Sequence, residues 1–197
     1  PMANVTDVAF RAMFAKYGKP DVMWTEFVSA DGLCSPGKAM LLRDLEFGEK
    51  ERPIVAQLFT GNADKMYEAV KIVEKLGFDG LDINMGCPDR AVEKQGAGAG
   101  HIKDYDNSIE VIRSAKRAAP NLPISVKTRI GYNKDEIDMW IGTLLKENIS
   151  ALTGHLRTRK EMSDVPAHWE LMPKIVELRN KISPETIILG NGDITSL

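Results

Sequence analysis

The chain has 197 residues, of which 43% are hydrophobic and 27% are charged, values that are ordinary for a globular protein. Its formal net charge of −2 gives no overall basic signal, so a nucleic-acid partner would need a local basic patch. No apolar run predicts a transmembrane helix or a secretory signal. Two cysteines and three histidines lack disulfide or metal-ligand spacing, so we expect no metal and a reducing, cytoplasmic setting.

Short apolar runs alternate along the chain with segments of helical periodicity. The predicted strands span residues 22–27, 53–59, 80–84, 124–128, 150–155 and 186–190. The predicted helices follow Thr6, Asn62, Asp106 or Asn107, and Asn133, and a last helix, interrupted by Pro173, carries Ile175 to Leu178. Residues 31–52 give only a weak signal.

Strands that are separated by helices need parallel crossover connections, so the pattern predicts an α/β fold. Six strands are counted, and Pro1-Met2 could be the tail of an earlier one. We therefore expect a TIM-type (β/α)8 barrel that is truncated at both ends, with about seven of its eight units present. The alternative, an open doubly wound sheet, is disfavoured because no GxGxxG follows the first strand.

Each predicted strand carries a polar residue toward its carboxyl end. These residues are Glu26, Gln57, Asn84, Lys127, His155 and Asn191. In a parallel barrel all carboxyl ends open onto one face, which holds the active site, so six polar side chains should converge on one cavity. Any one of them alone could simply mark a strand leaving for solvent.

Four further features have a functional and a structural interpretation. Lys127 at a strand end would be desolvated unless it met an anion or an electron-rich ring, and Cys87 in a Gly-rich loop favours a reactive role over that of a small hydrophobe. The glycines of 96–100 fit a mobile lid better than a phosphate cradle. The basic segment 155–160 could meet a phosphate-rich partner or be solvated, whereas Cys34 is interpreted as structural.

The sequence resembles the tRNA-dihydrouridine synthases along its whole length. The matching segments are PMANVTD (1–7), TEFVSADG (25–32), VAQLFTGN (55–62), DINMGCP (82–88), SVKTRIGY (125–132), GHLRTRKEMS (154–163) and GNGDI (190–194). They occur in the order typical of the family. The resemblance implies a TIM-type barrel that binds FMN, takes its electrons from NADPH and reduces the C5–C6 bond of a uracil ring in tRNA.

The resemblance also implies roles for individual residues. The family's proton donor to C5 of the uracil corresponds to Cys87. The family's flavin contacts fall on Met2, Gln57, Lys127, His155, Asn191, Gly192 and Asp193. Its uracil contacts suggest Asn84, Arg129 and Arg157.

The chain departs from the family pattern in two respects. His101 stands where the family usually has an apolar residue, and the segments that form the last strand and the C-terminal helical RNA-binding domain are absent. Residues 1–197 are thus expected to form an incomplete FMN-binding catalytic barrel that holds FMN and tRNA weakly by itself. Two alternatives remain open: an FMN-dependent dihydropyrimidine or dihydroorotate dehydrogenase that acts on a free base, and a non-catalytic RNA-binding module.

Overall fold

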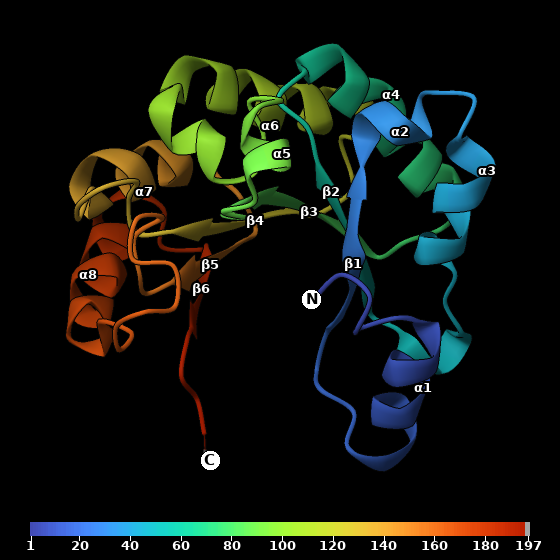
Figure 1. Ribbon diagram of the computed structural model, residues 1–197, viewed down its shortest axis with the longest axis horizontal. Helices are drawn as coiled ribbons and strands as arrows, with labels where there is room; N and C mark the ends of the chain where they lie inside the picture. The colour runs from blue at the N-terminus through green and yellow to red at the C-terminus, as the bar shows by residue number, and fades with distance from the viewer. Residues whose placement is uncertain (196–197) are drawn as a thin grey trace.

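A computed structural model describes residues 1–195, which form one curved parallel sheet covered by helices (Figure 1). The strands are β1 (Met23–Ser29), β2 (Ile54–Phe59), β3 (Gly80–Met85), β4 (Ile124–Arg129), β5 (Ala151–His155) and β6 (Ile187–Asn191). They lie in the sheet in chain order, each paired in parallel with the next. Parallel neighbours in sequential order require a helical crossover at every step.

The helices differ widely in length, and all of them except the first, which precedes β1, lie in the crossovers between strands. The α-helices are α1 (Val8–Tyr17), α2 (Ala30–Leu33), α3 (Lys38–Leu41), α4 (Ala63–Lys75), α5 (Arg90–Glu93), α6 (Tyr105–Ala118), α7 (Ile137–Lys146) and α8 (Met172–Ile182). The 3-10 helices are η1 (Leu42–Leu45), η2 (Glu49–Glu51), η3 (Gly98–Lys103) and η4 (Trp169–Leu171). No helix in residues 1–195 has the length and apolar character needed to cross a bilayer.

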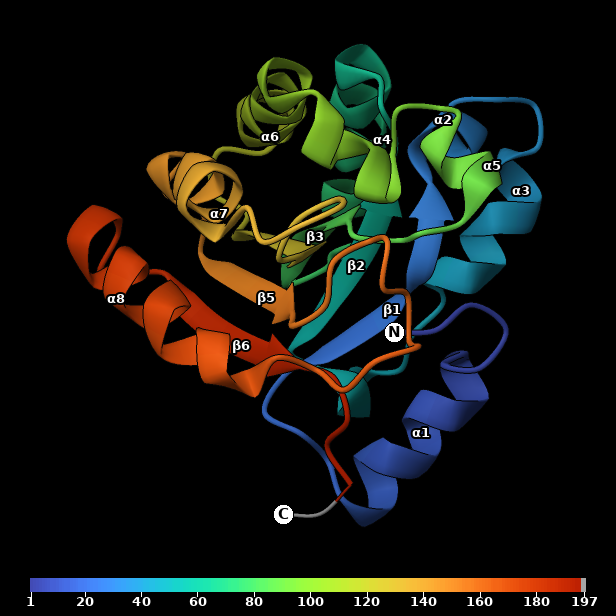
Figure 2. The ribbon, with the colours of Figure 1, turned by 60° about the vertical axis from the view of Figure 1, so that its left-hand side comes forward.

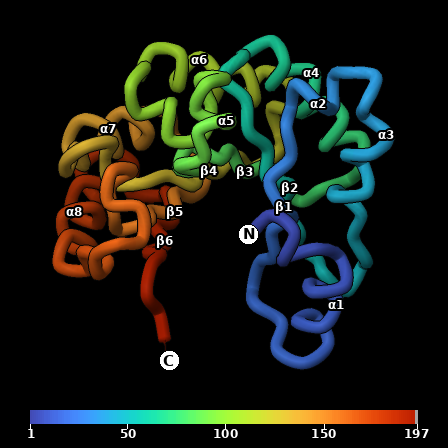
Figure 3. Tube along the Cα trace, viewed as in Figure 1, coloured from blue at the N-terminus to red at the C-terminus, as the bar shows by residue number. Residues whose placement is uncertain are grey.

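The sheet bends into an arc, and its two faces differ. Figures 1 and 2 show α4, α6, α7 and α8 on the convex side, whereas the first residues of the chain lie on the concave side. The tube in Figure 3 follows the same arc, with both ends of the chain on its open side. The main apolar core lies between the convex face and these helices, so the concave face is left to line a site.

All six predicted strands are present, with ends that differ by at most two residues. Pro1 and Met2 form no strand; residues 1–7 make a turn in which Thr6 N donates to Met2 O at 3.0 Å. The described residues therefore hold six strands of the barrel, and not part of a seventh. The weak segment 31–52 contains only short helical turns.

Four predicted helix details are wrong. The helix expected directly after Asn133 begins only at Ile137, with Glu136 as its N-cap. The N-cap of α1 is Asp7, whose side chain accepts from Phe10 N, and the N-cap of α6 is Asp104, whose side chain accepts from Asn107 N. Pro173 lies in the first turn of α8 and does not interrupt it, because the first turn needs no N–H donor.

The Gly-rich segment is part of the structure beneath the Cys87 loop, which contradicts the expectation of a lid. Residues 98–103 form η3, and Ala99 N donates to Cys87 O at 2.9 Å. Gly98 has φ of +56°, and a Cβ there would lie 2.6 Å from Cys87 O. Glycine is needed at this position for backbone conformation and for close packing.

Candidate active site

Alternate residues of β2 to β6 point into the concave side of the arc. The register stacks them in layers that rise toward the carboxyl ends of the strands. These layers are Gln57–Asp82–Ser125, Asn84–Lys127–Thr153 and Arg129–His155–Asn191. Five of the six polar residues predicted to converge therefore share this face, some of them one or two residues before the strand ends. The sixth, Glu26, accepts a hydrogen bond from Val5 N at 3.3 Å.

A hydrogen-bonded network of buried side chains forms the lowest layer. Asp82 accepts from Gln57 Nε2 and from Ser125 Oγ, both at 2.5 Å. Asn84 Nδ2 donates to Gln57 Oε1 at 3.0 Å, which fixes the orientation of the glutamine amide. Burial raises the pKa of Asp82, against the effect of the hydrogen bonds from Ser125 and Gln57. The network orients the groups that face the cavity above it.

Lys127 lies above this network in a cavity of about 220 Å³. The cavity is lined by Pro1, Trp24, Gln57, Asp82, Lys127, Thr153, Leu189, Gly190 and Asn191. The ammonium group donates to Asn191 Oδ1 at 3.3 Å, its one hydrogen bond to residues 1–195. Burial lowers the pKa of Lys127, whereas the nearby Asp82 raises it. Two N–H groups of this ammonium remain available to an acceptor in the cavity.

The Cys87 loop, residues 86–89, is held by its backbone. Cys87 N donates to Asn84 Oδ1 at 2.9 Å, and its carbonyl accepts from Ala99 N. Burial raises the pKa of the Cys87 thiol, whereas the charges of Arg129 and Lys127 act to lower it. The thiol is therefore protonated at neutral pH and lies within electrostatic reach of the Lys127 ammonium.

His155 is a neutral ring with a fixed tautomer. Its pKa is lowered to about 4, first by burial and then by the charges of Arg129, Lys127 and Arg157. Arg157 Nη1 lies 3.1 Å from His155 Nε2. A guanidinium can only donate, so Nε2 accepts and Nδ1 carries the proton. The ring can therefore offer an N–H at neutral pH.

The turn after β6 is bound to Arg157. Its guanidinium Nη2 lies 2.6 Å from both carboxylate oxygens of Asp193, and Nε donates to Val165 O. Gly192 has φ of +126°, where a Cβ would lie 2.9 Å from Ala167 Cβ. Arg157 thus holds the turn that carries the predicted cofactor residues, and its role as a uracil contact stays a prediction.

Of the predicted site residues, only Gln57, Lys127 and Asn191 line this cavity; Asn84, Cys87, His155, Gly192 and Asp193 lie outside its lining, as do Arg129, Arg157 and Met2. Arg129 donates to three backbone carbonyls, those of Gly86, Thr158 and Met162, at 2.9 to 3.0 Å. Its guanidinium thereby joins the loops that follow β3 and β5. The side chain of Met2 is 56% exposed and does not line the cavity.

The basic segment 155–160 is largely paired within the molecule. Arg157 binds Asp193, and Arg159 Nε donates to Glu93. Lys160 is exposed and makes no ion pair with residues 1–195. Two of the three cations of this segment are therefore engaged within the molecule, and its contact with a phosphate-rich partner stays a prediction.

Sequence reasoning missed Asp82, Trp24 and Thr153. The signal for Asp82 was available, because Asp82 and Asn84 alternate with the apolar Leu81, Ile83 and Met85 and must share one face of a strand. Within residues 1–195 no three His, Cys, Asp or Glu side chains are grouped so that they could hold a metal ion.

The donor set suits a flat, acceptor-rich cofactor such as a flavin. The Lys127 ammonium has free donors, the His155 ring offers an N–H, and both face the site from neighbouring strands. The Asn191–Gly192 turn brings backbone close to the cavity. The residues present therefore fit the FMN that the resemblance implies.

Comparisons with known proteins agree with this geometry. A family model described as dihydrouridine synthase (Dus) matches residues 1–197. A probable tRNA-dihydrouridine synthase 2 of Bacillus subtilis (strain 168) is 46% identical over 98% of this chain and 60% of its own length. A probable tRNA-dihydrouridine synthase of Staphylococcus aureus (strain COL) is 43% identical over 98% and 59%. The chain thus spans about three fifths of these curated relatives.

A solved structure also matches the chain. A variant of NCR from Zymomonas mobilis has a TM-score of 0.55 over 97% of this chain and 71% of that chain. The identity is 16%, so this likeness concerns the fold alone. With the parallel sheet and the family match, it confirms the predicted TIM-type α/β fold. The predicted family is confirmed as well: the chain belongs to the dihydrouridine synthase family.

Proposed function

We propose that this chain is the catalytic barrel of a tRNA-dihydrouridine synthase that uses FMN and NADPH, and that Cys87 donates a proton to the uracil ring. The single observation that carries the proposal is the shared environment of Cys87 and Lys127. The thiol is kept protonated by burial, and the charge of the lysine acts on it from the next strand. Cys87, in the loop after β3, and Lys127, on β4, thus supply a neutral acid and a cation from neighbouring positions of the sheet, and these are the groups that reduction of a uracil ring requires.

The reaction adds two hydrogens across the C5–C6 bond of uracil. When bound, FMN would supply the hydride that C6 receives, with NADPH as the source of electrons. Cys87 donates its proton to C5, and the thiolate that remains regains a proton from water. Uracil, NADPH and a proton thus become dihydrouracil and NADP+, with atoms and charges in balance.

The residues around the cavity hold the reacting groups. Lys127 and the Nδ1–H of His155 would donate to acceptor atoms of the cofactor, and a cation there stabilises negative charge on a reduced ring. Asn191 orients the lysine. Asn84 holds the amide of Cys87 and would set the height of the thiol above the cavity.

The substrate assignment to tRNA comes from the names of the relatives and from the family. A uracil within folded RNA must leave its stack before a buried thiol and a cofactor can reach it.

The test is dihydrouridine mapping. The natural gene product that carries this sequence is incubated with NADPH and tRNA from a strain that lacks dihydrouridine, and nucleosides are measured by mass spectrometry. Dihydrouridine at defined positions, with NADPH consumed only when tRNA is present, is expected. Turnover of free uracil or orotate instead, or RNA binding with no turnover and no flavin absorption, would contradict the proposal.

A further inference from the structure

A group of charged and aromatic side chains outside the cavity joins the loops around Cys87. Glu93 is the last residue of α5, the short helix that follows the Cys87 loop, and its side chain is only 10% exposed. Tyr132 OH donates to Glu93 Oε2 at 2.6 Å, and Arg159 Nε donates to Glu93 Oε1. Tyr132 follows β4 and Arg159 follows β5, so one carboxylate connects three strand-end loops.

Arg159 extends this group to the residue beside the cysteine. Its Nη2 donates to Pro88 O at 3.2 Å. Its own backbone is anchored, because Arg159 N donates to Gly131 O at 2.9 Å. The Pro88 carbonyl is therefore held from the loops after β4 and β5, and the position of Cys87 depends on them.

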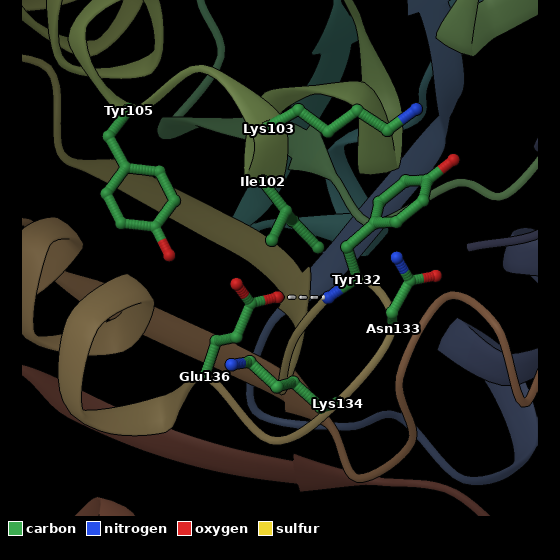
Figure 4. A pocket seen from close by; sticks show the side chains of 7 residues that line it. All are labelled: Ile102, Lys103, Tyr105, Tyr132, Asn133, Lys134 and Glu136. Carbon is green, nitrogen blue, oxygen red and sulfur yellow. Dashed lines mark hydrogen bonds between the residues drawn. The ribbon is translucent and has the colours of Figure 1, made fainter.

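Lys103, the last residue of η3, is the fourth member of this group. Its ammonium lies 3.8 Å from Glu93 Oε2 and 4.0 Å from the centroid of the Tyr132 ring. Figure 4 shows this lysine beside the Tyr132 ring at a surface pocket of about 940 Å³, where Glu136 also binds the backbone N of Tyr132. Since η3 packs beneath Cys87, the group holds the cysteine loop from both sides.

The carboxylate of Glu93 is ionised at neutral pH. Burial acts to raise the pKa of Glu93, but hydrogen bonds from Tyr132 and Arg159 outweigh it, so the pKa is lowered. A glutamine at this position would keep the size of the side chain and remove its charge. Breaking a largely buried pair leaves the other charge poorly solvated, so Arg159 would reorganise and release Pro88.

We infer that Glu93, acting through Arg159 and Tyr132, is a positioning residue that fixes the Cys87 loop and thereby sets the direction and exposure of the thiol. Neither Glu93 nor Arg159 lines the cavity, and the group reaches the reacting residues through the hydrogen bond from Arg159 to Pro88, the residue next to Cys87. The inference rests on the proposed function only for its effect on uracil reduction; the effect on the thiol itself is independent of it.

The test measures thiol reactivity directly. In the natural gene product, Cys87 of Glu93→Gln is alkylated with iodoacetamide, and peptide mass spectrometry follows it separately from Cys34. We expect alkylation of Cys87 to become about tenfold faster, which corresponds to loop opening that is easier by about 1.4 kcal/mol. Alkylation of Cys34, more than fifty positions away in the chain, should keep its rate.

Glu147→Gln is the matched control. Glu147 is also 10% exposed and binds Arg113 through both oxygens at 2.9 Å, but it lies at the end of α7, outside the group around Glu93. Its substitution should leave the alkylation of Cys87 unchanged. In the reaction, Glu93→Gln should slow uridine reduction and leave flavin reduction by NADPH unaltered.

Each outcome decides one question. Equal alkylation of Cys87 in the wild type and in Glu93→Gln overturns the inference, and so does a parallel increase at Cys34, which would mean general loosening. If Glu93→Gln does not fold, Arg159→Lys is measured, because it keeps the cation and removes the second donor that holds Pro88. Faster alkylation without any dihydrouridine formation would leave the inference standing and contradict the proposed function alone.

Discussion

The two faces of β3 carry side chains of opposite chemical character. Leu81, Ile83 and Met85 point outward and are fully buried in the apolar core. Asp82 and Asn84 alternate with them, point inward and are also buried. The same backbone therefore separates a face that stabilises the fold from a face that carries chemistry.

The difference has an energetic side. Apolar side chains gain about 25 cal/mol for each Å² removed from water, so the outer face contributes to stability. Buried polar groups gain little from burial and need hydrogen bonds to avoid a net cost. The inner layers meet that need with one another: Gln57 and Ser125 both donate to Asp82, and Lys127 donates to Asn191. These inner polar side chains therefore contribute less to stability than the apolar side chains of the outer face.

The largest expected effect is the loss of uridine reduction in a variant that keeps its fold. Cys87→Ala should lower uridine reduction by about 10²- to 10⁴-fold, the usual contribution of a general acid, while NADPH still reduces the flavin. Because burial raises the thiol pKa, the wild-type rate should decline with rising pH only above the ordinary value of 9.0. Stopped-flow absorbance and dihydrouridine analysis measure the two steps.

Cys34→Ala is the control for this variant. Cys34 lies against α4, where its thiol approaches Lys65 O at 3.7 Å, and both steps should proceed at the wild-type rate. Undiminished uridine reduction in Cys87→Ala would mean that another group supplies the proton.

The second expected effect is a loss of stability when a side chain on the outer face of β3 is shortened. Ile83→Ala removes a fully buried side chain between the sheet and its helices, and should cost about 2–5 kcal/mol in the free energy of unfolding. Urea denaturation followed by circular dichroism measures it. The residual folded protein should reduce uridine at the wild-type rate per molecule. A cost below 1 kcal/mol would mean that the core is packed less tightly here than the structure indicates.

Much of the fold could be predicted from sequence because it depends on local patterns. Apolar runs and helical periodicity gave the strands in their order, and the polar residue in each strand indicated which side would hold the site. Lys127 and Cys87 were placed together by topology alone, since parallel strands bring their carboxyl ends to one side. These inferences needed no knowledge of side-chain contacts.

The remaining details depend on contacts between distant residues. Arg157 and Asp193 are 36 positions apart, and only the folded loops reveal that they form an ion pair. Arg129 donates to three backbone carbonyls in loops whose positions no sequence pattern could give. The glycines of 96–100 suggested mobility, whereas one of them, Gly98, is required for close packing against Cys87.

The third expected effect is a pH dependence of stability that arises from the inner face of β3. Asp82→Asn keeps the shape of a buried side chain, since the amide can accept from Gln57 and donate to Ser125. The pKa of Asp82 is raised in the folded state, so its contribution to stability is complete below the ordinary value of 3.8 and is lost as pH rises through the folded-state pKa. Relative to Asp82→Asn, the wild type should therefore lose stability between acid and neutral pH.

Urea titrations of both proteins at several pH values measure this difference. A gap between the two unfolding free energies that stays constant with pH would mean that Asp82 does not change its ionisation on folding. The corresponding substitution on the outer face, Ile83→Val, should show no dependence of this kind, because it contains no ionisable group.

The smallest expected effect concerns α6, on the convex side of the sheet. It distinguishes Asp104 from Asp106 as the residue that caps the start of this helix. Asp104 Oδ1 accepts from Asn107 N at 3.1 Å, so Asp104→Ala should cost about 1 kcal/mol of stability, as loss of an N-cap usually does. Asp106 lies inside the first turn without such a bond, and Asp106→Ala should change stability by less than about 0.5 kcal/mol. The opposite order in thermal denaturation would place the start of the helix where the sequence pattern suggested. Because α6 covers the convex face, neither substitution should alter the alkylation of Cys87, and a change there would mean that the two faces are coupled.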